Sequence, residues 1–279
     1  MKLYTDIVTD YLAGRSLAAH AQEWFFTQPG YYFQEPDGSD AQKAAVRQVY
    51  EQVLRTVETF VPGNRPVWDA LFPDWQDILR GAETALIVGY PPPNDAVVLK
   101  SPAGVDTAVL DMGLWVQYLG AVPVERVAHN LLTHELCHVC IHRHRPELDA
   151  VQETGDYLSR LDAFTFDEGF AHFVSYNDRE ANQVDWDAPE LRAVWTRSAA
   201  AMRSARQETQ PAQQQEQLHS AVFGSYYDKY ACMCGLYYLA RCWQEGGSAR
   251  LAEEFTAGWQ GFAKKHCPEN QNLRLGRRF

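Results

Sequence analysis

The segment HELCH, at residues 134–138, holds the residues with the clearest chemical potential in the chain. Two histidines four residues apart lie on neighbouring turns of an α-helix, where both imidazoles can point at one ion. A glutamate beside the first histidine reaches a water molecule held by that ion rather than the ion itself. The spacing therefore predicts a Zn²⁺ site with His134 and His138 as ligands and Glu135 as general base.

Residues 124–145 have the signs of the single helix that this spacing requires. Pro123 precedes the segment, basic residues crowd its last turn, and Pro146 follows it, which suits the start and end of a helix. His134 and His138 lie on its apolar, core-facing side, where ring nitrogens need partners. A shared ion supplies such a partner; the alternative is a structural pair of core histidines.

Other histidines and cysteines of this segment receive different interpretations. His142 lies eight residues after His134, about 12 Å along the axis, which is too far for both to bind one ion. We expect His142 at a cleft wall or at the helix end. Cys137 and Cys140 form a CxxC that projects away from the histidine face, and we interpret them as structural thiols rather than a redox or zinc pair.

A catalytic zinc needs a third protein ligand. An HExxHxxGxxH arrangement is absent, because no glycine turn follows His138. A glutamate on a second helix is the other common solution, and residues 161–176 read as such a helix with Asp162 as its cap. Glu168 lies in this otherwise apolar segment, where a carboxylate is costly unless it is paired, as it would be with a metal. The small Gly169 beside it is expected to let this helix approach the first one closely.

HELCH at 134–138 and DEGFAHF at 167–173 together resemble the gluzincin superfamily of zinc peptidases, in particular predicted zinc-dependent proteases with an EGxA motif. The resemblance covers roughly residues 96–243. It implies a zincin-like fold, Zn²⁺ as cofactor, and hydrolysis of a peptide or protein substrate. It also implies the site residues: the ligands His134, His138 and Glu168, and the base Glu135.

The sequence departs from the superfamily's pattern in three ways. His138 and Glu168 are separated by 29 residues, a longer gap than in thermolysin-like enzymes, and the aminopeptidase GxMEN segment is absent. Thermolysin-like enzymes place an aspartate four residues after the ligand glutamate, where this chain has His172. We expect Asp167 or Asp162 to hold a metal ligand in its place. These departures leave the substrate class open.

The mechanism also needs a hydrogen-bond donor for the tetrahedral oxyanion. Gluzincins usually supply a tyrosine or histidine from a later helix, and residues 225–243 read as a buried helix with Tyr226 and Tyr230 on one face. Most tyrosines in such a stripe are core residues. We assign the donor role first to Tyr230 and then to Tyr226. An extended peptide is expected to lie against a strand at 95–99 or 106–112.

The sequence patterns of the elements that must position these residues predict an α+β fold. It has a small mixed sheet and a mainly helical second half. Apolar spacing predicts a helix at 40–60. Apolar runs between turn residues predict strands at 84–90, 95–99 and 106–112, the last two forming a hairpin. We expect one part at 1–123, with N-terminal helices and the sheet, and another at 124–279, with both ligand helices. Together they are expected to form one catalytic unit with the cleft between them.

The bulk composition agrees with an enzyme that works in water. The 279 residues are 46% hydrophobic and 22% charged, and the net charge is −11, which argues against a nucleic-acid partner. No apolar run is long enough for a membrane span, and Asp6 and Asp10 interrupt any signal-like segment. The six cysteines lack the spacing of a disulfide framework, so we expect a cytoplasmic protein.

Three functions compete on this evidence. The first is a zinc metallopeptidase. The second is a catalytically silent zinc-binding regulatory or interaction module on a zincin fold, against which the intact Glu135 argues. The third is a cysteine-dependent redox or metal-storage protein, against which the orientation of Cys137 and Cys140 argues.

Overall fold

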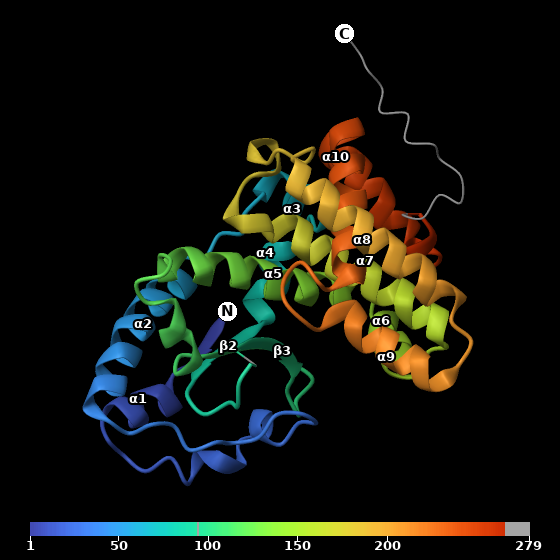
Figure 1. The fold of residues 1–279 in the computed structure, drawn as a ribbon. Helices are drawn as coiled ribbons and strands as arrows, with labels where there is room; N and C mark the ends of the chain where they lie inside the picture. Colours follow the sequence, from blue (N-terminus) through green and yellow to red (C-terminus); the bar gives the residue numbers. More distant parts are fainter. Residues whose placement is uncertain (94, 266–279) are drawn as a thin grey trace. The chain divides into compact units, whose positions relative to one another are not determined.

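The computed structural model describes residues 1–93 and 95–265, and backbone contacts divide the chain into two units (Figure 1). The first unit comprises Met1–His144 and Val174–Glu180, and the second comprises Arg145–Phe173 and the chain from Ala181 on. The division differs from the expected boundary at residue 123, because the helix that carries HELCH packs inside the first unit.

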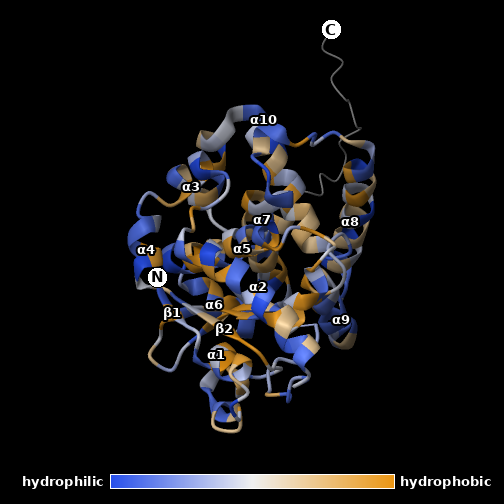
Figure 2. Cartoon of the chain, turned by 90° about the vertical axis from the view of Figure 1, so that its left-hand side faces the viewer, coloured by the Kyte–Doolittle hydropathy of each residue, from blue (hydrophilic) through white to orange (hydrophobic). Residues whose placement is uncertain are grey.

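A four-stranded mixed sheet lies in the first unit. Its strands are β1 (Lys2–Tyr4), β2 (Glu83–Ile87), β3 (Ala96–Lys100) and β4 (Asp106–Asp111), in the order β1-β2-β4-β3. β1, β2 and β4 run parallel, whereas β3 pairs antiparallel with β4 and forms an edge. The predicted strands and hairpin are confirmed. Figure 2, coloured by hydropathy, shows apolar residues at β2. This strand is almost wholly buried, as expected of a central strand, whereas β1 is too short to leave a sequence pattern.

Helices of the first unit surround this sheet. They are α1 (Asp6–Leu12), α2 (Asp40–Glu58), α3 (Arg65–Leu71), α4 (Trp75–Gly81) and α5 (Val124–His144), with 3-10 turns η1 (His20–Gln22), η2 (Trp24–Phe26), η3 (Leu114–Tyr118) and η4 (Tyr176–Asp178). The predicted helices at 40–60 and 124–145 are confirmed as α2 and α5. Ser39 caps α2 by accepting from the amide of Gln42, as an N-cap serine does. α5 packs against α2, α4 and β3.

Asp111 ties together the turns that follow β2 and β4. Its carboxylate is 1% exposed and accepts backbone N–H groups from Gly89, Tyr90, Gly113 and Leu114 at 2.6–3.0 Å. Burial raises the pKa of Asp111 to about 6, against the lowering effect of these donors. A buried carboxylate with four donors is a fixed structural element of this end of the sheet.

The second unit is helical. Its elements are α6 (Glu147–Thr154), α7 (Tyr157–Ser175), α8 (Pro189–Gln207), α9 (Pro211–Val222) and α10 (Tyr230–Ala257), with 3-10 turns η5 (Ala181–Gln183) and η6 (Phe262–Lys264). α7 begins in this unit, and its last two residues belong to the first. Gly246 and Gly247 have non-helical backbone angles and break α10, shortly after the expected helix end at residue 243.

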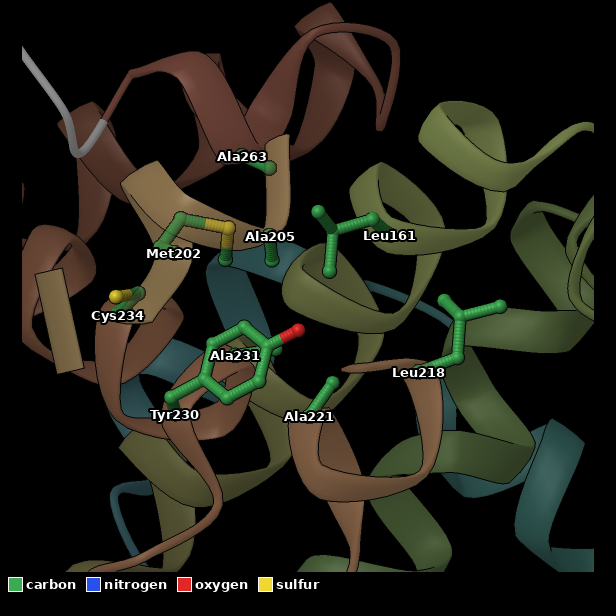
Figure 3. Close-up of a cluster of buried hydrophobic side chains, with 9 residues drawn as sticks. All are labelled: Leu161, Met202, Ala205, Leu218, Ala221, Tyr230, Ala231, Cys234 and Ala263. Atoms are coloured by element: carbon green, nitrogen blue, oxygen red, sulfur yellow. The ribbon is translucent and has the colours of Figure 1, made fainter. Parts of the chain in front are cut away.

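Two helix starts differ from the sequence predictions. α7 begins at Tyr157, so Asp162 lies inside the helix and is not its cap. α10 begins at Tyr230 instead of residue 225, which leaves Tyr226 in the loop before the helix. Side chains from α7, α8, α9 and α10 form one buried cluster, which includes Leu161, Met202 and Leu218 (Figure 3).

The chain as described in residues 1–93 and 95–265 contains no helix with the length and apolarity that crossing a bilayer requires.

Candidate metal centre

The two histidines of HELCH converge on one point. The Nε2 atoms of His134 and His138 lie 3.2 Å apart, and the rings meet edge to face with centroids 4.9 Å apart. Two nitrogens bound at about 2.0–2.1 Å to one tetrahedral zinc ion would lie about 3.3 Å apart. The pair is therefore spaced as two ligands of one such ion. Leu132, Leu136 and Val139 are buried beside the pair and fix the rotation of α5.

Ser175 holds the other nitrogen of the first histidine. Its Oγ lies 3.4 Å from Nδ1 of His134, and the serine is 5% exposed. When Nδ1 carries the proton and donates a hydrogen bond to Oγ of Ser175, Nε2 keeps its lone pair for a metal. The role of Ser175 was not predicted, because a single serine at the end of a helix carries no pattern. Its place at the end of an apolar helix face was the only available signal.

The loop between α2 and α3 anchors the segment that carries Ser175. The amide of Gly63 donates to Oγ1 of Thr133, the neighbour of His134, at 3.2 Å. Asn64 is 2% exposed, and its Nδ2 donates to the carbonyl oxygens of Val174 and Arg179, both at 2.9 Å. One loop therefore binds both α5 and the end of α7.

His129 adds a charged link at the same place. Its Nδ1 contacts the carboxylate of Asp178, and its Nε2 donates to the carbonyl of Val61 at 2.7 Å. The hydrogen bond with Asp178 raises the pKa of His129 above its usual range. Because both ring nitrogens face acceptors, the imidazolium form fits this position best.

Glu135 is half-buried and faces the aromatic N-terminal segment. Burial raises the pKa of Tyr31, and the negative charge of Glu135 raises it further. The Tyr31 ring packs on Tyr90 with centroids 5.1 Å apart. Glu135 therefore lies near a phenol that stays protonated at neutral pH.

His142, Cys137 and Cys140 share the HELCH helix with the histidine pair. The ring of His142 is 6.3 Å from that of His138, between centroids, so His142 borders the pair. Cys137 and Cys140 are fully buried, and burial raises the pKa of Cys140, which suits inert structural thiols. The sixth cysteine, Cys267, lies outside the described residues.

Glu168 lies in the second unit with two partners on one carboxylate oxygen. Its Oε2 is 3.2 Å from Nδ1 of His172 and 3.6 Å from Sγ of Cys232. His172 is 2% exposed, and its Nδ1 also contacts the backbone carbonyl of Glu168 at 2.9 Å. The expected proximity of His172 to Glu168 is present, whereas Cys232 was missed, because only the packing of α10 on α7 brings it there.

Each of the two aspartates expected to hold metal ligands has a partner within the second unit. Asp162 accepts the backbone N–H groups of Gly261 and Ala263 at 2.7 and 2.9 Å, so it fixes the segment after α10. Asp167 is 4% exposed, and its Oδ2 accepts from Nε2 of Gln152 at 2.9 Å, which ties α7 to α6.

The two candidate tyrosines differ sharply in environment. Tyr230 is 4% exposed, lies in the buried cluster (Figure 3), and donates its hydroxyl to the carbonyl of Gln217 at 2.8 Å. Tyr226 is 37% exposed, and its ring lies 5.3 Å from that of His172, between centroids. The first choice of oxyanion donor, Tyr230, is therefore a core residue, and Tyr226 lies beside the partner of Glu168.

The chain has no match among protein-family models, curated proteins or solved structures. Its function is therefore inferred from its own residues and their geometry.

Proposed function

We propose that this protein is a zinc-dependent metallopeptidase with a zincin-like fold, in which His134, His138 and Glu168 bind the metal. The observation that carries the proposal is the 3.2 Å separation of the two Nε2 atoms on α5. Ser175, on the Nδ1 side of His134, supplies the outer hydrogen bond that ligand histidines usually make.

The course of α7 supports Glu168 as the third ligand. Ser175, which contacts His134, lies seven residues after Glu168 on one continuous helix. Seven residues are close to two full turns, so the two side chains lie on the same helix face, within about 20°. A carboxylate in such a helix is stabilised by donors, and His172 and Cys232 provide them.

Zinc bound by these residues would lower the pKa of a water molecule and polarise the peptide carbonyl. Glu135 would take the proton from the attacking water and deliver it to the departing nitrogen. Tyr226, a residue that is 37% exposed, would donate a hydrogen bond to the oxyanion. β3 is an edge strand of the sheet, along which an extended peptide could add as a further strand.

Replacement of Glu135 by glutamine tests the proposal. Glu135→Gln should lower the rate of cleavage of a broad peptide mixture by about 10²–10⁴-fold, because the general base is lost. Zinc content, measured by atomic emission, should stay at one ion per chain. Glu125→Gln is the matched control, because Glu125 lies in the exposed first turn of the same helix.

Two results would contradict the proposal. Equal cleavage by the wild type and Glu135→Gln would show that this glutamate is not the base. One zinc ion per chain, with no cleavage by either protein, would favour the silent zinc-binding module instead.

A further inference from the structure

α7 and α10 cross inside the second unit at two glycines. A methyl group added to Gly235 would lie 2.6 Å from Cα of Gly169 and would also collide with the carbonyl oxygen of Thr165. The two backbones are therefore in direct contact, and only glycine fits. Glu168 is the neighbour of Gly169, and Cys232 lies one turn before Gly235, so the crossing fixes these two side chains against each other.

Cys232 is completely buried, and its Sγ has two acceptors within reach. These are Oε2 of Glu168 at 3.6 Å and the carbonyl oxygen of Ala221, near the end of α9, at 3.7 Å. A thiol ordinarily carries its proton at neutral pH, so Sγ can donate to either oxygen. A carboxylate is a stronger acceptor than a backbone carbonyl.

The last torsion of a glutamate side chain is soft and has two equivalent orientations. In Glu168 this symmetry is broken, because Nδ1 of His172 and Sγ of Cys232 both contact Oε2. Nδ1 of His172 also contacts the backbone carbonyl of Glu168, so its single N–H group is shared between two acceptors. Cys232 is therefore a second, independent restraint on the orientation of the carboxylate.

We propose that Cys232 is a positioning residue for the third metal ligand, whose S–H group holds the carboxylate of Glu168 in the orientation that binds the metal. This inference rests on the proposed function, because it takes Glu168 to be a ligand. Groups that orient a metal ligand in this way typically contribute 10–100-fold to metal affinity. Cys232 touches neither metal nor substrate in this account and acts through Glu168 alone.

The test compares three variants of the full chain by competitive Zn²⁺ titration. Cys232→Ala removes the donor and should weaken zinc affinity by about 10–100-fold. Cys232→Ser keeps a donor and should restore affinity to within a few fold of the wild type. Cys234→Ala is the matched control, since Cys234 is equally buried two residues later but lies in the apolar cluster (Figure 3). In the metal-depleted state, Cys232→Ala and Cys234→Ala should unfold at similar midpoint temperatures.

A second readout follows the hydrogen bond itself without any metal. The infrared S–H stretch of Cys232, identified as the band that Cys232→Ala removes, should shift to higher frequency in Glu168→Ala. An unshifted band would overturn the inference. So would a Cys232→Ala protein that binds zinc as tightly as the wild type, provided that Glu168→Ala binds it more weakly. A wild-type protein that binds no zinc, or binds it independently of Glu168, would instead overturn the proposed function.

Discussion

Tyr226 and Tyr230 lie four residues apart, yet their hydroxyls have different surroundings. The hydroxyl of Tyr230 is used within the core, on the carbonyl of Gln217. Tyr226 is partly exposed, and its ring packs at a tilt against that of His172. At the residue scale, the contacts of each hydroxyl therefore decide which tyrosine suits the role of oxyanion donor. The sequence pattern alone ranked Tyr230 before Tyr226, which is the opposite order.

Removal of each hydroxyl should separate catalysis from stability. Tyr226→Phe should lower kcat by about 10²-fold, through loss of an oxyanion donor, with little change in the free energy of unfolding. Tyr230→Phe should lower the free energy of unfolding by about 1–2 kcal/mol, because a buried carbonyl loses its partner, and leave kcat unchanged. Peptide hydrolysis and urea denaturation of both variants measure the two effects. The reverse pattern would restore Tyr230 as the donor.

Backbone contact between α7 and α10 is the decisive feature at the element scale. The small Gly169 was expected to serve the approach of α7 to the HELCH helix. The structure instead places Gly169 against Gly235 of α10. A glycine in a helix predicts a close neighbour, but the sequence does not say which helix that neighbour belongs to.

Gly235→Ala should lower the free energy of unfolding by about 3 kcal/mol or more. Alanine gains about 1 kcal/mol of helix propensity over glycine, but the added methyl group must push two backbones apart, which costs more than that gain. Gly81→Ala is the control, because a methyl group there meets no atom within 4 Å. Denaturant midpoints of both variants measure the difference. Equal midpoints would show that the α7–α10 contact is looser than the structure indicates.

Element existence was predictable, whereas element ends and long-range partners were not. The strong periodicity of α2 and α5 and the apolar runs of β2, β3 and β4 were recognised from sequence. The start of α7 was misplaced, because Asp162 resembles a helix cap but instead accepts the N–H groups of Gly261 and Ala263. That partnership lies about a hundred residues along the chain, so no local pattern records it.

At the scale of the whole molecule, α7 is one of the segments that pass between the two units, because it begins in the second unit and ends in the first. The motif HELCH was sufficient to predict that His134 and His138 lie together on one face of a helix. The contacts of Ser175 and Cys232 could not be predicted, because only tertiary packing brings these residues to His134 and Glu168.

The identity of the atoms that bind the metal tests the central claim, which is that His134, His138 and Glu168 hold one zinc ion. X-ray absorption spectroscopy of the zinc-loaded protein should show one zinc ion per chain, with imidazole nitrogen and carboxylate oxygen at about 2.0–2.2 Å and no sulfur. His134→Ala, His138→Ala and Glu168→Ala should each weaken zinc binding. Sulfur at about 2.3 Å, with zinc lost in Cys137→Ser but retained in His138→Ala, would contradict the account.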